Sequence, residues 1–219
     1  MQMSESHDRL PALARRLLES LAAPVLEPFL ADWAGSQISR GAPGRPAVPR
    51  AAAPRTGDAP CTLPVLRWLP RIAAQPRGFG SALVTALCRS APSLAWRQSY
   101  TSGELDADFM ENYGWTEILG PRSCGGGGQT ACGLLLLGAD TFYPPHRHEA
   151  EEIYVPLHGA AEWRQGDAVW RRRAPGTLIH HESEESHAMR TAAEPLLALY
   201  LWRSADLCQE SRLDQRGAA

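Results

Sequence analysis

The segment HRHEAEEIY, residues 146–154, is the most informative part of the sequence, because it places imidazole, carboxylate and phenol groups within a few residues. Side chains two apart on an extended strand share a face, so His146 and His148 point the same way, and Glu152 and Tyr154 form a second such pair. A short bend between the pairs would let all four converge. Nitrogen and oxygen ligands without thiolate suit zinc, iron(II), manganese, cobalt or nickel. The segment therefore predicts a site for one divalent transition metal ion.

The alternative interpretation is a pair of surface histidines followed by a solvated acidic run. The surrounding sequence favours the metal site, because the segment lies between apolar stretches typical of strands. These stretches are separated by turn residues, as at 165–167 and 175–176. The expected strands cover residues 132–137, 151–157, 161–164, 168–172, 177–181, 186–190 and 195–202. Short strands at such intervals predict a mainly β fold, an antiparallel barrel or jelly roll whose interior holds one ligand.

The spacing of these residues resembles the cupin family. Gly138, followed by His146-x-His148, Glu152 and Gly159, is similar to the first cupin motif, although the interval after Gly138 is two residues longer than usual. The second motif is looser. It begins at Pro175 and leaves open which of three histidines closes the site: His180, His181 or His187. The resemblance implies a single cupin barrel.

Two longer stretches, residues 143–154 and 186–191, resemble the cupin-type dimethylsulfoniopropionate lyases of marine bacteria, with further similarity at 199–202. The resemblance implies an enzyme that splits dimethylsulfoniopropionate into dimethyl sulfide and acrylate. It also implies metal ligands, which are His146, His148, Glu152 and His187. The resemblance also implies Tyr154 as an additional or exchangeable ligand. In some relatives the histidine that corresponds to His146 lies in the pocket wall instead of binding the metal.

The implied reaction is a β-elimination, in which a base removes a proton next to the carboxylate while the carbon–sulfur bond breaks. A bound metal ion would offset the charge that develops on the substrate. Two tyrosines are candidate bases: Tyr154, on the face of Glu152, and Tyr143, three residues before His146. A phenol has a reference pKa of about 10, so either tyrosine needs a nearby cation to act as a base at neutral pH. Each could instead be a packed strand aromatic.

The first half of the chain predicts an α-helical N-terminal extension over residues 1–120. Leucines at helical spacing in residues 8–33, interrupted by Pro11 and Pro24, indicate two short amphipathic helices. A Pro- and Ala-rich linker is expected near 36–60, further helices within 63–88, and a strand or pocket lid at 96–100 and 115–119. The cupin barrel is expected over 121–210 and a C-terminal tail over 211–219. The helices would cover the barrel or mediate a homodimer.

Composition excludes several classes of protein. All 22 basic residues are arginine, so the chain cannot use a Schiff-base lysine, a Walker lysine or pyridoxal phosphate attachment. The net charge of −2 gives no electrostatic case for nucleic acid, and no apolar stretch approaches membrane-spanning length. The five cysteines form no CxxC pair, which together with the lack of an export signal predicts a cytoplasmic protein.

Two further functions stay open at this point. Two histidines and one carboxylate around a metal also serve iron(II) oxygenases, so a cupin dioxygenase or an isomerase acting on another small carboxylic acid is one alternative. A non-catalytic, small-molecule-sensing cupin that keeps the metal is the other. The presence of both Tyr143 and Tyr154 argues against a sensor.

Overall fold

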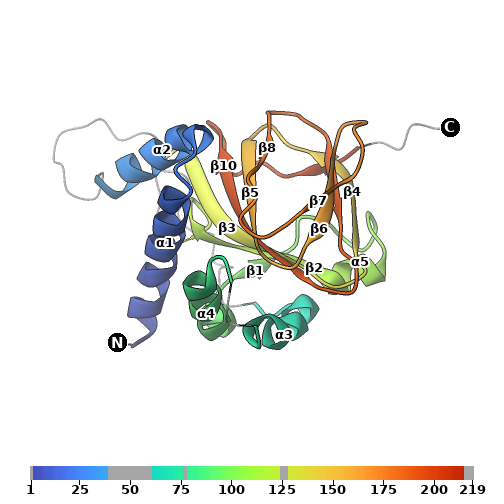
Figure 1. Cartoon of the computed structure of the whole chain (residues 1–219), viewed down its shortest axis with the longest axis horizontal. Helices are drawn as coiled ribbons and strands as arrows, with labels where there is room; N and C mark the ends of the chain where they lie inside the picture. The colour runs from blue at the N-terminus through green and yellow to red at the C-terminus, as the bar shows by residue number, and fades with distance from the viewer. Residues whose placement is uncertain (1, 39–60, 76–77, 124–127, 215–219) are drawn as a thin grey trace.

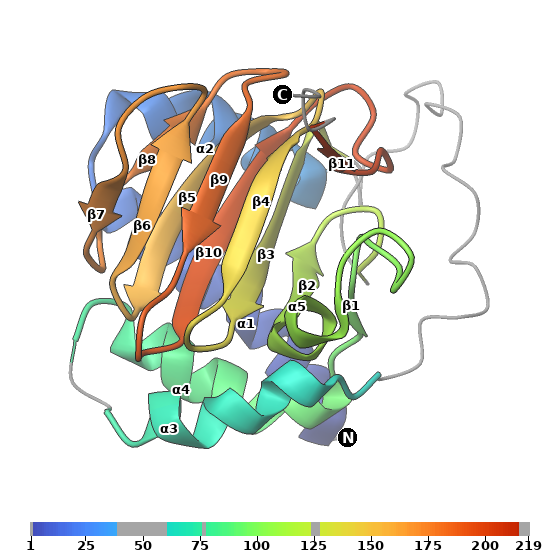
Figure 2. The same cartoon turned by 90° about the vertical axis from the view of Figure 1, so that its right-hand side faces the viewer.

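Two antiparallel sheets face each other in the computed structural model, which describes residues 2–38, 61–75, 78–123 and 128–214 (Figures 1 and 2). One sheet has six strands and the other has five. This arrangement confirms the mainly β, jelly-roll prediction. The expected linker near residues 36–60 lies largely outside the described residues, as does the end of the expected C-terminal tail.

The expected strands are present in the expected order, with shifts at their ends. Two further strands lie outside the expected ranges: Phe142–Arg147, and Arg212–Leu213 within the expected C-terminal tail. The hairpin after residue 165 is longer than expected, because the next strand begins at Arg171 rather than at Ala168. The six-stranded sheet has the order β1 (Trp96–Arg97), β2 (Tyr113–Leu119), β3 (Thr130–Leu137), β10 (Leu196–Arg203), β5 (Glu151–His158) and β8 (Ile179–His181). The five-stranded sheet has the order β11 (Arg212–Leu213), β4 (Phe142–Arg147), β9 (His187–Arg190), β6 (Ala161–Gln165) and β7 (Arg171–Arg173).

The six-stranded sheet is buried on both faces, which explains why β3 and β10 are continuous apolar runs rather than alternating ones. On β3, Leu134 and Leu136 belong to the core shared with the helices, whereas Leu135 and Leu137 belong to the core between the sheets. Strand β5 alternates in the same way. Its Ile153 packs toward the helices. Side chains alternate between faces along a strand, so Glu152 and Tyr154, on either side of Ile153, lie on the inner face.

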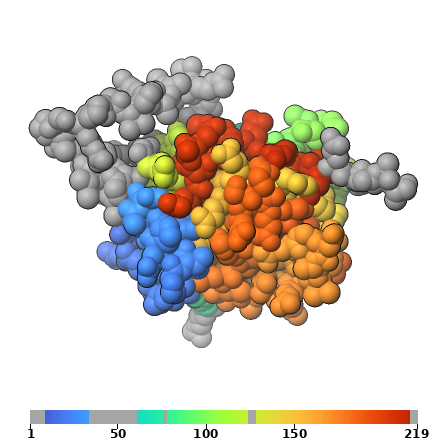
Figure 3. All heavy atoms as spheres, turned by 90° about the horizontal axis from the view of Figure 1, so that it is seen from above, coloured from blue at the N-terminus to red at the C-terminus, as the bar shows by residue number. Residues whose placement is uncertain are grey.

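The first helices cover the outer face of the six-stranded sheet (Figures 1 and 3), and later ones lie across one end of the two sheets (Figure 1). Those before residue 60 are α1 (Gln2–Ser20), η1 (Pro24–Leu26) and α2 (Glu27–Ile38). The later ones are η2 (Pro64–Trp68), α3 (Leu69–Ala73), α4 (Ser81–Ser90), η3 (Ala91–Ser93) and α5 (Ala107–Asn112). The expected helices at 63–88 are confirmed. The segment at 96–119 contributes β1 and β2. Strand β1 pairs with β2, and β2 pairs with β3.

The expected helix break at Pro11 is wrong, because α1 continues through this residue. Leu10, Ala14 and Leu18 recur every four residues and are fully buried against the core. Packing of this stripe outweighs the backbone hydrogen bond that proline cannot make. The break at Pro24 is confirmed, since α1 ends before it and a short 3-10 turn begins at this residue.

Gly133 lies where β3 packs most closely on its neighbours. A Cβ added there would lie 2.2 Å from the Thr116 carbonyl oxygen and 2.4 Å from the Tyr200 hydroxyl oxygen. We expect Gly133→Ala to lower the free energy of unfolding by about 3 kcal/mol, because backbone in a sheet interior cannot move away. Urea denaturation measures this. Gly103→Ala is the control, since its Cβ meets nothing closer than 3.8 Å; equal midpoints for the two variants would contradict the expectation.

Candidate metal centre

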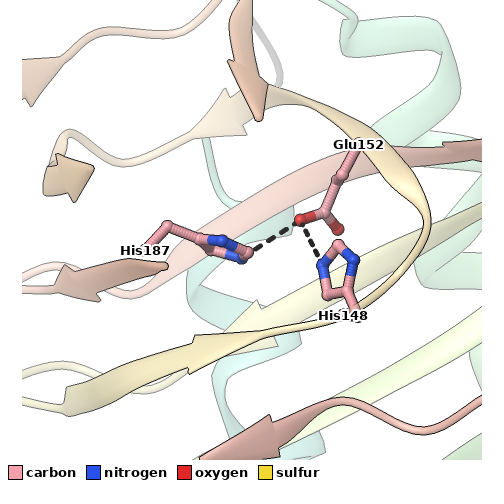
Figure 4. A group of neighbouring side chains, drawn as sticks. All are labelled: His148, Glu152 and His187. Carbon is pink, nitrogen blue, oxygen red and sulfur yellow. Dashed lines mark hydrogen bonds and ion pairs between the residues drawn. The ribbon is translucent and has the colours of Figure 1, made fainter. Parts of the chain in front are cut away.

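Three buried side chains converge inside the barrel: His148, Glu152 and His187 (Figure 4). Glu152 comes from β5, His187 begins β9, and His148 follows directly after β4. The Nε2 atoms of His148 and His187 lie 3.1 Å and 3.2 Å from the same Glu152 oxygen, Oε2. One ligand atom from each residue lies within 4.8 Å of the others. The bend that the sequence requires between the two halves of the motif lies at residues 148–150.

Backbone carbonyls fix the orientation of each histidine ring. The Nδ1 atom of His148 lies 2.9 Å from the Ala150 carbonyl oxygen, and that of His187 lies 2.8 Å from the Glu185 carbonyl oxygen. A carbonyl only accepts hydrogen bonds, so Nδ1 donates in both rings. The neutral ring then leaves Nε2 as an electron-pair donor that faces Glu152. Such anchoring is the usual arrangement behind metal-binding histidines.

This donor set fits a divalent cation. Two Nε2 atoms with their electron pairs directed at a carboxylate oxygen repel it unless a proton or a cation lies between them. The Nε2 atom of His187 is buried, and although it lies 3.2 Å from Oε2 of Glu152, it makes no hydrogen bond of good geometry among the described residues. An ion held by His148, Glu152 and His187 would satisfy all three groups, and imidazole with carboxylate matches the ligand preferences of first-row transition metals.

With no ion between them, Glu152 and His148 stabilise each other's charged forms. Burial acts to raise the pKa of Glu152, but the neighbouring His148 and His187 imidazoles outweigh it and hold that pKa well below its ordinary value. Burial acts to lower the pKa of His148, yet the Glu152 carboxylate and the Ala150 carbonyl raise it overall. Glu152 is therefore ionised, which is the form that binds a cation.

His146 is adjacent to this group but not part of it. Its ring stacks on Tyr143 with centroids 3.8 Å apart and lies 4.2 Å from the ring of His187. Its Nδ1 lies 2.9 Å from the Pro144 carbonyl oxygen. Burial and the neighbouring His187 lower the pKa of His146 well below its usual value, so this ring is neutral. The structure brings three of the four predicted ligands together and places His146 in the cavity wall beside them.

The other two histidines of the second motif are on opposite faces of β8. His180 points outward and its Nε2 lies 2.8 Å from Oε1 of Glu151. His181 points inward, is fully buried, and stacks on His187. Burial and the nearby His187 lower the pKa of His181 to about 2, so it is neutral. Of the three histidines that the sequence left open, His187 is the one that contacts Glu152 through a ring nitrogen.

A cavity of about 370 Å³ reaches from His146, His148 and Glu152 to the surface. Both candidate bases, Tyr143 and Tyr154, line it. Burial raises the pKa of each well above 10, and the Glu152 charge raises the pKa of Tyr154 further. Each phenol is therefore protonated in the protein without a cation. The aromatic residues of the cavity wall are Tyr113, Trp115, Tyr143, Tyr154, Tyr200 and Trp202.

Trp202 contacts the centre directly, which the sequence alone did not reveal. Its indole Nε1 donates to Oε1 of Glu152 at 2.6 Å, and its ring lies 4.4 Å from that of His148. This bond fixes the Glu152 oxygen that does not face the two histidines. The period of β10 could have indicated it, because Trp202 is two residues beyond Tyr200 and shares its inward face.

Comparison with known proteins identifies similar sequences and structures. The profile of a family described as dimethylsulfoniopropionate lyase matches residues 47–198. The dimethylsulfoniopropionate lyase DddQ of Ruegeria pomeroyi is 37% identical over 108 residues, covering 49% of this chain and 54% of that protein. The chain spans about half the length of the curated relatives it matches.

Two solved structures are similar over most of the chain. One, from a crystallographic study of the lyases RdDddP and RnDddQII, has a TM-score of 0.74 at 26% identity and covers 97% of this chain and 100% of its own. The crystal structure of DddQ from Ruegeria pomeroyi has a TM-score of 0.66 at 29% identity, with 87% and 96% coverage. Among the described residues, no helix has the length and apolar character needed to span a membrane.

Proposed function

We propose, because the chain belongs to the dimethylsulfoniopropionate lyase family, that it is a metal-dependent lyase that cleaves dimethylsulfoniopropionate to dimethyl sulfide and acrylate. The observation that carries this proposal is the cavity, whose wall includes His148 and Glu152 of the metal-binding group together with Tyr143 and Tyr154. A metal-binding group and candidate bases thus face one space, and that space opens to solvent. The expected cupin architecture is confirmed by the same relatives and by the two facing sheets.

The reaction requires a base and a means of stabilising negative charge. The base takes a proton from the carbon next to the carboxylate, the electrons of that bond form the double bond of acrylate, and dimethyl sulfide leaves with the electrons of the carbon–sulfur bond. Sulfonium is a good leaving group, so proton removal is the difficult step. A divalent ion bound by His148, Glu152 and His187 would supply Lewis-acid stabilisation of the substrate carboxylate and lower the pKa of a neighbouring phenol.

Tyr154 is the base in this proposal. It lies two residues beyond Glu152 on the inner face of β5, and the Glu152 carboxylate is among the groups that raise its pKa. Neutralising that carboxylate removes part of this effect and favours the phenolate. Tyr143 is the second candidate. Its hydroxyl lies 3.0 Å from that of Tyr100, which in turn donates to the Ser211 hydroxyl at 3.1 Å.

Aromatic side chains suit the other end of the substrate. Tyr200 lies between Trp115 and Trp202, with ring centroids 6.3 Å from each. All three rings line the cavity. Aromatic faces attract a sulfonium group as they attract quaternary ammonium, by cation–π interaction. We propose that this wall holds the dimethylsulfonium group while the carboxylate faces the metal centre.

Product analysis tests the proposed activity. Purified protein loaded separately with zinc, iron(II), manganese, cobalt or nickel is incubated with dimethylsulfoniopropionate, and headspace gas and solution are analysed. We expect dimethyl sulfide and acrylate in equal amounts. Metal without protein is the blank. No sulfide above this blank with any of the five ions would refute the lyase.

A second candidate function has one specific observation in its favour. Two histidines and one carboxylate, as in His148, Glu152 and His187, are also the ligand set of non-haem iron(II) oxygenases. A dioxygenase acting on another small carboxylic acid would consume oxygen when the iron-loaded protein meets its substrate. The lyase needs none, so an oxygen electrode in the same reaction separates the two functions.

A further inference from the structure

The bend at residues 148–150 joins the two halves of the metal-binding motif and lies outside the β ladders. Strand β4 ends just before it and β5 begins just after it. The bend nevertheless carries one candidate ligand, His148, and also the Ala150 carbonyl that accepts a hydrogen bond from Nδ1 of this ring. Any shift of the bend therefore moves the His148 ring relative to Glu152.

One side chain of the C-terminal segment holds this bend. The Oε1 atom of Gln209 accepts hydrogen bonds from the backbone N–H groups of Glu149 at 2.6 Å and Ala150 at 3.2 Å. Its Nε2 atom donates to the Ser204 hydroxyl at 3.2 Å and to the Asp206 carbonyl oxygen at 2.7 Å. Ala150 is fully buried, so water does not readily replace the amide as acceptor for its N–H group. The Gln209 amide thus links the bend to a segment far along the chain.

The segment that carries Gln209 is held in place by other contacts as well. The Arg122 guanidinium donates to the carbonyl oxygens of Leu207 at 2.6 Å and Gln209 at 3.1 Å. Farther along, β11 pairs with β4, and the backbone N–H of Asp214 donates to the Pro145 carbonyl oxygen at 2.9 Å. A segment fixed on both sides of Gln209 can hold the bend in one position. It also stays attached when only the Gln209 amide is removed.

We propose that Gln209 is a positioning residue of the metal centre, whose amide holds the bend so that Nε2 of His148 faces Glu152 in the geometry that an ion requires. Groups beyond the direct ligands set the orientation of those ligands and thereby the affinity of a metal site. Without the amide, two backbone N–H groups lose their acceptor, and the bend must move to find another. This inference rests on the metal-binding part of the proposed function and is independent of the substrate.

Metal binding measured without substrate tests the proposal, because Gln209 also lines the cavity and could affect substrate binding directly. Apo-protein is titrated with cobalt(II) in competition with a chromophoric chelator, and the visible absorption of the bound ion is recorded. Gln209→Met keeps the length of the side chain but removes the amide. We expect it to lower cobalt affinity by about 10-fold, the low end of the range for groups that support metal ligands, and to change the spectrum. Circular dichroism checks the fold, and Gln209→Ala gives a second reading if methionine does not pack.

Ser204→Ala is the matched control. It removes the hydroxyl that accepts from Nε2 of Gln209 and from the backbone N–H of Asp206, but it leaves the two Oε1 bonds to the bend in place. We expect unchanged affinity and an unchanged spectrum. An equal loss of affinity in Ser204→Ala would overturn the proposal, because the effect would then belong to the segment as a whole.

Folded Gln209→Met and Gln209→Ala proteins that bind cobalt as tightly as wild type, with the same spectrum, would also overturn the proposal, as would a wild type that binds no cobalt. The lyase activity is tested separately on the same preparations. A protein that shows the Gln209 effect but releases no dimethyl sulfide would keep this inference and refute the lyase. Dimethyl sulfide release by a wild type whose Gln209 variants bind cobalt normally would refute this inference alone.

Discussion

Glu152→Gln is expected to abolish both metal binding and the release of dimethyl sulfide. Glu152 supplies the only carboxylate of the metal-binding group among the described residues, and its Oε2 lies 3.1 Å and 3.2 Å from two histidine nitrogens. The amide keeps the shape but removes the charge. Removing a group that only supports a metal ligand costs up to about 100-fold in affinity, so loss of this ligand should cost more. Metal content after gel filtration and headspace analysis of the same sample measure both effects.

Glu151→Gln is the matched control for this prediction. Glu151 is the preceding residue on β5, but its side chain is part-exposed and contacts His180 and Arg203 on the outer face. Like Glu152→Gln, this substitution replaces one carboxylate by an amide and removes one negative charge. We expect normal metal content and turnover. Equal loss in both variants would indicate a general electrostatic or folding effect, and retained metal in Glu152→Gln would contradict the assigned centre.

The sequence predicted most of the strands, and three of its four proposed metal ligands lie together in the structure, because both depend on short-range periodicity. Side chains two apart share a face of a strand, so Glu152 and Tyr154 could be placed together, and the alternation of β5 separated them from Ile153, although both faces of the strand are buried. A continuous apolar run such as β3 predicts burial on both faces, but it does not reveal what covers the second face. Here that cover is the N-terminal helices.

Long-range register could not be predicted in the same way. Trp202 contacts Glu152 because β10 pairs with β5 in one particular register, which places these two residues opposite each other. His181 is near His187 because the turn after β8 brings β9 back against it. The periodicity of β10 indicates that Trp202 faces inward with Tyr200, but the contacts themselves do not follow from spacing along the chain. The same holds for Pro11, where burial of Leu10 and Ala14 decides the local structure against the preference of proline.

Helix α5 was missed for a different reason. It is only six residues long, too short for a helical period to be recognised. The local sequence does contain a start signal, because the Asp106 side chain accepts a hydrogen bond from the backbone of Phe109 at 2.8 Å. A capping residue alone is common in loops, so it did not distinguish a helix from a turn.

Tyr154→Phe is expected to keep the metal ion but to lower kcat by about 10²- to 10⁴-fold, the usual contribution of a positioned general base. Phenylalanine removes only the hydroxyl, and Tyr154 packs among Trp163, His181 and His187 through its ring. The metal-binding group of His148, Glu152 and His187 stays intact. Metal content and initial rates of dimethyl sulfide release, measured on one preparation, separate loss of the base from loss of the ion.

Tyr143→Phe is the comparison that assigns the base to one tyrosine. The Tyr100 hydroxyl donates to Ser211, so in the short contact between Tyr100 and Tyr143 the Tyr143 hydroxyl is the donor, and its proton already has a protein acceptor. The acceptor of the Tyr154 hydroxyl is the ionised Glu152, itself a member of the metal-binding group, so a bound cation acts most strongly on the pKa of Tyr154. We therefore expect a smaller loss of kcat in Tyr143→Phe. A larger loss of kcat in Tyr143→Phe, with Tyr154→Phe close to wild type, would identify Tyr143 as the base. The variant that lacks the hydroxyl of the base must show the larger loss of kcat.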